Sequence, residues 1–74
     1  MELREHLGKD VSRCTTQLLG GKTELTFTDG TEVVVYDGKD LDVHGNIQDI
    51  FGKMGTVPFD EVRLNALNQV LENA

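Results

Sequence analysis

The chain has 74 residues, of which 38% are hydrophobic and 27% are charged, and it contains a single proline. This length allows one domain, residues 1–74, and the composition is that of a folded protein rather than a disordered one. The formal net charge of -6 disfavours direct binding to nucleic acid, because contacts with phosphates depend on lysine and arginine.

The first predicted element is a short helix over residues 2–11. Leu3, Leu7 and Val11 recur every four residues, which places their side chains on one face of a helix. Gly8 interrupts this pattern and costs the helix about 1 kcal/mol relative to alanine.

Residues 12–37 predict a three-stranded antiparallel meander. Gly20-Gly21 and Asp29-Gly30 are turn signals, and the runs beside them are rich in threonine, valine and aromatic residues, as strands prefer. With a two-residue loop at each turn, Leu25 pairs with Thr16 in the first hairpin and with Val34 in the second. Alternation then assigns one face to the core: Cys14, Thr16, Leu18, Leu25, Phe27, Val34 and Tyr36. The wetter face receives Thr15, Gln17, Glu24, Thr26, Val33 and Val35.

Two helices are predicted after the sheet, over residues 46–54 and from about Pro58 to Glu72. In the first, Asn46 is a suitable N-cap and the apolar residues follow helical spacing: Ile47, Ile50, Phe51 and Met54. In the second, proline and two acidic residues suit the first turn. The order of elements predicts the α+β class, with the C-terminal helices packed on one face of the sheet.

The last predicted helix is apolar over an arc of about 200°, roughly twice the width typical of a surface helix. Either this helix is packed on two sides, or part of the arc meets another chain. We expect a homodimer with C2 symmetry, the commonest closed arrangement. Its predicted interface is either the edge of the last helix formed by Leu64, Leu67 and Leu71, or the face of the sheet that carries Val33 and Val35.

Two segments resemble ligand-binding loops. Gly20-Gly21-Lys22-Thr23 ends like a phosphate-binding loop, but Thr16 replaces the required earlier glycine and a strand follows, so we interpret it as a hairpin turn. The segment from Asp40 to Ile47 resembles the start of the EF-hand calcium loop. However, His44 is a poor calcium ligand, and Phe51 stands where that loop needs its bidentate glutamate. We therefore interpret this segment as an acidic connector with a glycine turn.

The spacing of the reactive side chains predicts neither catalysis nor metal binding. His6, His44 and Cys14 are the nitrogen and sulfur ligands available, and none lies in a paired spacing such as Cys-x-x-Cys. Cys14 falls on the predicted core face, where a small apolar residue is the commoner role. We expect no enzyme, no cofactor and no metal, and a small-ligand or metal-binding domain remains an alternative.

The sequence also predicts a compartment. No apolar run approaches the roughly 18 residues of a membrane span, and the N-terminus has no stretch like the core of a signal peptide. Cys14 stands alone, so no internal disulfide can form, as is usual in a reducing compartment. We expect a cytoplasmic domain that contacts no membrane.

The negative charge is concentrated in residues 29–49, where one lysine faces six acids: Asp29, Glu32, Asp37, Asp40, Asp42 and Asp49. Fixed carboxylates on a connector can stand in for phosphates in a basic groove, and they steer encounter. We therefore predict a protein partner that is basic or binds nucleic acid. The predicted contact residues are Asp37, Asp40, Asp42 and Asp49.

The order helix, three strands, helix resembles the double-stranded-RNA-binding domain, which grips phosphates with a basic cluster at the start of the helix after the sheet. Here the predicted helices begin with Asn46-Ile47-Gln48-Asp49 and Pro58-Phe59-Asp60-Glu61, so the likeness is confined to topology. The same order with an acidic surface resembles some small phage anti-CRISPR inhibitors. We interpret the chain as a non-catalytic protein-interaction module, an acidic inhibitor of a nucleic-acid-binding partner. A homodimeric adaptor is the alternative.

Overall fold

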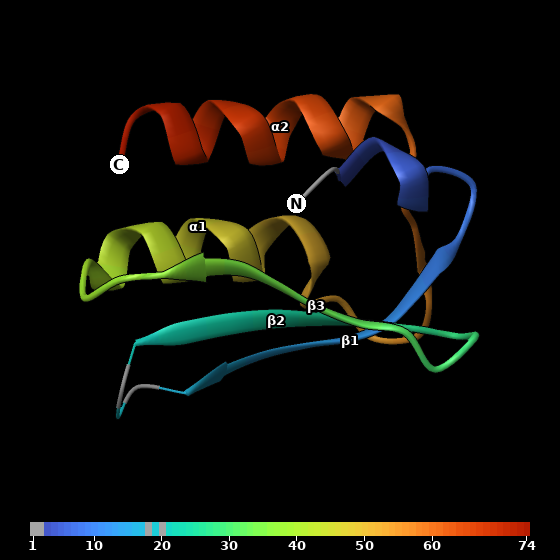
Figure 1. The fold of residues 1–74 in the computed structure, drawn as a ribbon, viewed down its shortest axis with the longest axis horizontal. Helices are drawn as coiled ribbons and strands as arrows, with labels where there is room; N and C mark the ends of the chain where they lie inside the picture. Colours follow the sequence, from blue (N-terminus) through green and yellow to red (C-terminus); the bar gives the residue numbers. More distant parts are fainter. Residues whose placement is uncertain (1–2, 18, 20) are drawn as a thin grey trace.

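The computed structural model describes residues 3–17, 19 and 21–74 (Figure 1). This part of the chain is α+β, as predicted, and contains a four-stranded antiparallel sheet in the order β3-β2-β1-β4. The elements along the chain are a 3-10 helix η1 (Leu3–His6), β1 (Asp10–Gln17), β2 (Lys22–Phe27), β3 (Glu32–Asp37), α1 (Leu41–Phe51), β4 (Val57–Pro58) and α2 (Glu61–Glu72). Leu18 and Gly20, predicted for the core face and the first turn, lie outside the described residues. None of the described helices is long and apolar enough to cross a membrane.

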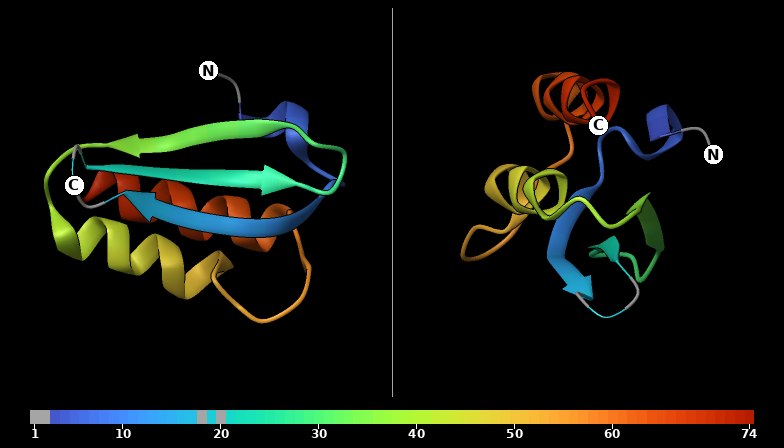
Figure 2. Two further views of the ribbon diagram at one scale, coloured as in Figure 1. Left: turned by 90° about the horizontal axis from the view of Figure 1, so that it is seen from below. Right: turned by 90° about the vertical axis from the view of Figure 1, so that its left-hand side faces the viewer.

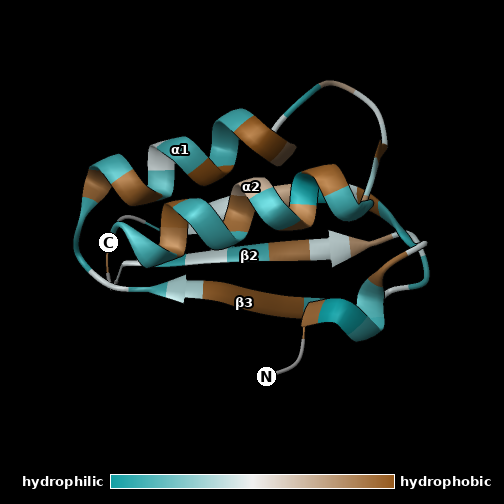
Figure 3. Ribbon diagram, turned by 90° about the horizontal axis from the view of Figure 1, so that it is seen from above, coloured by the Kyte–Doolittle hydropathy of each residue, from teal (hydrophilic) through white to brown (hydrophobic). Residues whose placement is uncertain are grey.

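Both α-helices lie on one face of the sheet and run antiparallel to each other (Figures 1 and 2). α1 packs on β1 and β2, and α2 packs on α1. The core between the layers is built around Phe59, whose ring lies 5.7 Å from that of Phe27 in the sheet and 5.8 Å from that of Phe51 in α1. Figure 3 shows the hydrophobic run along β3 and the mixture of polar and apolar residues on both helices.

The N-terminal helix is much shorter than the predicted range of 2–11. It ends before Gly8, whose φ of 91° is incompatible with a continuing helix. The following residues pair with the segment after β4 instead, because the Gly8 N–H donates to the Phe59 carbonyl at 3.1 Å and the Lys9 carbonyl accepts from the Phe59 N–H at 2.9 Å. This pairing extends the sheet by a strand that the sequence did not reveal.

The hairpin between β2 and β3 has a three-residue loop. The Phe27 N–H donates to the Thr31 carbonyl at 2.8 Å, and Gly30 occupies the left-handed region. The extra loop residue pairs Leu25 with Val33, and a shift by one residue exchanges the two faces of a strand. The predicted faces of the three valines are therefore wrong: Val33 and Val35 are 3% and 9% exposed, whereas Val34 is 37% exposed on the outer face.

A bulge in β3 restores the inward position that the sequence predicted for Tyr36. Val34 pairs with Glu24 and Tyr36 with Thr23, so that Val35 is an extra residue in the strand. Bulged neighbours turn to the same side of a sheet, and Tyr36 is accordingly half-buried.

The first hairpin also differs from the predicted register. Thr16 pairs with Thr23, and Cys14 rather than Thr16 pairs with Leu25. This difference amounts to two residues, so it leaves Cys14 and Thr16 on the inner face, where both are half-buried. The segment Gly21-Lys22-Thr23 enters a strand, as the interpretation as a hairpin turn requires.

α1 begins five residues before the predicted start at Asn46. The Asp40 carboxylate accepts the Asp42 N–H at 3.0 Å and caps the helix at its N-terminus. The acidic connector predicted for this segment is therefore helical from Leu41 onward. At the other end, Gly52 caps α1 and leaves Met54 fully exposed beyond it.

α2 begins later than predicted, because Pro58 belongs to a strand. Val57–Pro58 pair with the start of β1, and Asp60 then caps the helix by accepting the Arg63 N–H at 2.9 Å. Proline has no N–H to donate, and at this position of an edge strand none is needed.

The residues predicted for a dimer interface lie mainly in the core. Leu64 and Leu67 are 1% and 0% exposed, and Leu71 is half-buried against the core. With Val33 and Val35 also buried, four of these five side chains offer no surface to a second copy, and their expected exposure is wrong, whereas Leu71 stays partly exposed. The physical reason is that α2 packs both on α1 and over the core, which covers most of its wide apolar arc, although Val62 stays 74% exposed. The homodimer itself stays a prediction.

Candidate functional site

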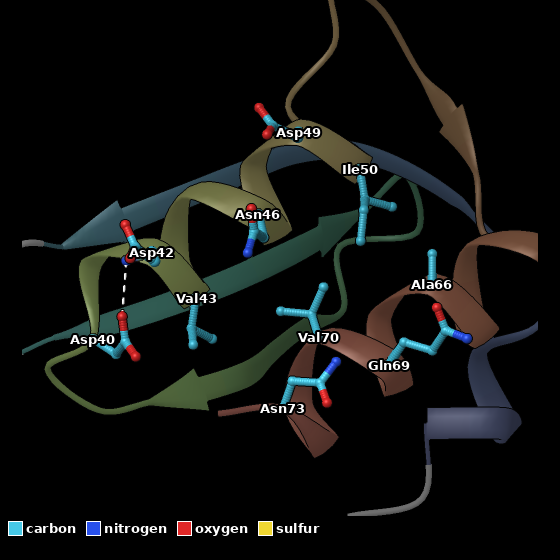
Figure 4. Close-up of a pocket in the computed structure, with 10 residues that line it drawn as sticks. All are labelled: Asp40, Asp42, Val43, Asn46, Asp49, Ile50, Ala66, Gln69, Val70 and Asn73. Carbon is cyan, nitrogen blue, oxygen red and sulfur yellow. Dashed lines mark hydrogen bonds between the residues drawn. The ribbon is translucent and has the colours of Figure 1, made fainter.

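An open groove of about 540 Å³ lies between α1 and α2 (Figure 4). Its apolar lining comes from both helices: Val43, Ile50, Ala66 and Val70. Its polar lining consists of carboxylates and amides: Asp40, Asp42, Asn46, Asp49, Gln69 and Asn73. Three of the four predicted contact residues therefore come together along one groove.

α1 holds the carboxylates of this groove in a row. Asp42, Asn46 and Asp49 are spaced by four and three residues, which places them on one side of a helix. From Asp40 to Asp49 the row extends about 13 Å at 1.5 Å per residue. All four side chains are exposed, and the ion pairs of the described residues include none of them. The negative charge of the three carboxylates is therefore not neutralised by an ion pair within this part of the protein.

Asp37, the fourth predicted contact residue, lies apart from this groove. It is the last residue of β3, and it is exposed. Because α1 begins directly after Asp40, the segment that resembled a calcium loop does not wrap around a central point. No cluster of three or more histidine, cysteine, aspartate or glutamate side chains that could hold a metal ion occurs among the described residues.

Beneath α1, a buried histidine links the helix to the sheet. The His44 Nε2 lies 2.7 Å from the Gly38 carbonyl, which can only accept, so this nitrogen carries the proton. The Nδ1 atom then accepts from the Thr23 hydroxyl at 2.5 Å. Tyr36 contacts the same imidazole edge-on, with a ring separation of 4.7 Å. His44, a candidate ligand by residue type, therefore joins the helix to the sheet.

The hydrogen-bond chain continues outward from Thr23. Its hydroxyl proton is committed to His44, so it accepts from the Thr16 hydroxyl at 3.0 Å, and Thr16 in turn accepts from the Gln48 amide at 3.1 Å. The same amide also donates to the Cys14 carbonyl at 2.9 Å. The chain fixes α1 on β1 and β2, and it thereby fixes the direction in which the acidic row faces.

The Thr23 hydroxyl, the His44 imidazole and the Gly38 carbonyl have the arrangement of a nucleophile, a base and an orienting group. Thr23 is 0% exposed, however, and His44 is 2% exposed. A substrate cannot reach the hydroxyl without opening the core. The role of these three residues is therefore structural.

Cys14 is also placed for packing rather than for reaction. Burial raises the pKa of its thiol to about 11, so the nucleophilic thiolate scarcely forms near neutral pH. The imidazole of His44 is committed to Thr23 and Gly38, and that of His6 stacks on Phe27 at 5.1 Å.

One acid of the 29–49 segment is committed to a turn. The pKa of Asp29 is lowered to about 2, chiefly because its carboxylate accepts the Thr31 N–H, with help from the Thr31 hydroxyl and Lys9. The Lys9 ammonium lies 3.1 Å from this carboxylate and also 3.2 Å from the His6 Nδ1. Asp29 therefore closes the β2–β3 loop and holds the N-terminal segment against it.

The structure departs from the order of elements that resembled the double-stranded-RNA-binding domain. Its N-terminal helix is a single 3-10 turn, and both α-helices follow the meander. The charge along α1 is negative where that family is basic. Comparison of the chain with protein-family models, with characterised proteins and with solved structures finds no match.

Proposed function

We propose that this protein is a non-catalytic interaction module that binds a basic protein partner in the groove between α1 and α2. The observation that supports this function is the row of exposed carboxylates beside an apolar floor. Asp42 and Asp49 stand on either side of Asn46, and Val43 and Ile50 lie between them and α2.

Lysine and arginine side chains suit both parts of this groove. Their aliphatic stems cover apolar surface while their charged ends remain at its polar margin. The carboxylates of Asp42 and Asp49 would receive the charged ends, and the amides of Asn46, Gln69 and Asn73 would complete the hydrogen bonding. A basic surface of a partner therefore meets complementary charge and complementary apolar area.

The spacing of the carboxylates favours a partner that ordinarily binds nucleic acid. Three carboxylates over about 13 Å leave two gaps of roughly 6–7 Å on average, which is close to the distance between every second charge along one strand of DNA, at about 3.4 Å per charge. A protein groove that neutralises phosphates would accept such a row, and occupancy would exclude the nucleic acid. We propose an inhibitor of this kind.

Two double variants of the protein, each used as bait to capture a partner, test the groove. Asp42→Asn with Asp49→Asn removes two groove charges without touching the helix cap, and Glu24→Gln with Glu72→Gln removes two charges outside the groove. We expect the wild type and the second variant to capture the same basic partner from the native host, and the first variant to lose it. Equal capture by both variants would place the contact outside the groove.

Competition then tests the inhibitory role. The captured partner is titrated with labelled nucleic acid in the presence of the protein, at low salt and at physiological salt. Displacement of the nucleic acid that weakens with added salt is the expected result, because exposed charge contacts are screened. A partner that binds the protein and nucleic acid simultaneously would be held by an adaptor, not by an inhibitor.

A further inference from the structure

The outer edge of β3 is a strand edge with unused backbone groups. β3 lies at the margin of the sheet, and Figure 2 shows it running along that margin from end to end. Among the described residues, no other strand pairs with its outer side. Edge strands are commonly blunted by charged side chains, proline or bulges; Glu32–Asp37 has no lysine or proline, and its protection is confined to one acid near each end and the bulge at Val35.

The register identifies which groups face this edge. The Phe27 N–H bonds to the Thr31 carbonyl, and hydrogen-bonded pairs alternate along an antiparallel ladder. The backbone groups of Glu32 and Val34 therefore point away from β2. The bulge at Val35 shifts the alternation by one residue, so Asp37 is the next residue to point outward. These three residues are also the exposed residues of β3.

The charges on this edge decide what can cover it. The side chains of Glu32 and Asp37 are exposed, and neither is in an ion pair within the described part of the chain. A second copy of β3 would bring four carboxylates together along one ladder, and like charges across strands are destabilising. An extended segment with lysine or arginine near both ends has the complementary charge.

We propose that the β3 edge binds an extended segment of a partner as an added antiparallel strand. Basic side chains of this segment lie opposite Glu32 and Asp37, and an apolar side chain lies opposite Val34. Main-chain hydrogen bonds to the edge hold the strand, and the alternate side chains select it. This inference does not depend on the groove between α1 and α2.

The probe is the end-blocked peptide Thr-Lys-Thr-Val-Thr-Lys-Thr, titrated into the labelled protein and followed by amide NMR. We expect saturable shifts at the amides of residues 32–37. The same peptide with both lysines replaced by glutamate should give none, and nor should the peptide with an N-methyl group on the valine amide. Equal binding of the N-methylated peptide, or shifts confined to the α1–α2 groove, would overturn the proposal. Concentration-dependent shifts of residues 32–37 without peptide would identify a second copy as the occupant and overturn it as well.

Matched variants test the edge from the side of the protein. Val34→Pro removes an N–H that the sheet does not use, and Val34→Thr keeps it. We expect the proline variant to bind the lysine peptide about five-fold more weakly than the threonine variant, the scale of one lost backbone hydrogen bond. Equal affinities in two folded variants would contradict the proposal. The N-methylated peptide gives the same test on the wild type, whatever the stability of the proline variant.

Discussion

Removal of the Thr23 hydroxyl tests the hydrogen-bond chain beneath α1. Valine has nearly the same shape as threonine and is equally suited to a strand, so Thr23→Val changes little besides the hydroxyl. The loss leaves the buried Nδ1 of His44 without a donor. An unsatisfied buried acceptor costs about 1–3 kcal/mol, and the half-buried Thr16 can turn to water at little cost. We expect a loss of about 2 kcal/mol in the free energy of unfolding.

The matched control is Thr15→Val. Thr15 neighbours the chain in β1, but it is exposed on the outer face, so the same chemical change should alter stability by no more than about 0.5 kcal/mol. Urea unfolding followed by circular dichroism gives both values. In thermal melts, the Thr23 variant should lose roughly 8–16 °C, since 1 kcal/mol corresponds to about 4–8 °C in a domain of this size. Equal stability of the two variants would refute the hydrogen-bond chain as described.

Three further outcomes follow from single positions. Gly45→Ala should raise the free energy of unfolding by up to about 1 kcal/mol in urea titrations, because Gly45 lies exposed within α1 with open space around it. Gly21→Ala should strongly destabilise the fold in the same assay, since Gly21 has a φ of 69° and an added Cβ would clash with the Gly38 carbonyl. The pKa of Asp29 is lower in the folded protein, so on acidification the unfolded chain takes up this proton at a higher pH. The melting temperature should therefore fall as the pH is lowered from about 4 to about 2, and it should fall less in the Asp29→Asn variant.

The fold class and the positions of the hairpins could be predicted because turn residues and strand formers are local signals. The loop length between β2 and β3 could not. Asp-Gly suits loops of two and three residues, and the choice here involves the Asp29 carboxylate accepting the Thr31 N–H at 2.9 Å. The one additional residue in the β2–β3 loop determined which face of the sheet Val33 occupies. The prediction of a sheet-mediated dimer depended on that face.

The start of α1 was missed because His44 and Gly45 are poor helix formers. Burial of His44 against the sheet outweighs that preference, and its hydrogen bonds cannot be read from spacing. The N-cap at Asp40 was readable, since an aspartate directly precedes an apolar pattern of helical period. The concentration of acids in this segment was readable from composition, whereas their helical setting and the separation of Asp37 from the groove were not.

The two proposed surfaces meet at the connection from β3 to α1. Asp37 ends the edge and Asp40 begins the groove, with Gly38 and Lys39 between them. The Gly38 carbonyl accepts from buried His44, so this connection is held to the core at its middle. One partner that carries a basic strand followed by further basic side chains could engage both surfaces, and the second contact would then form at a high effective concentration. If so, Val34→Pro and the pair Asp42→Asn, Asp49→Asn should each weaken the same complex. Their combination should be more severe than either alone, whereas two independent partners would each respond to one of the changes.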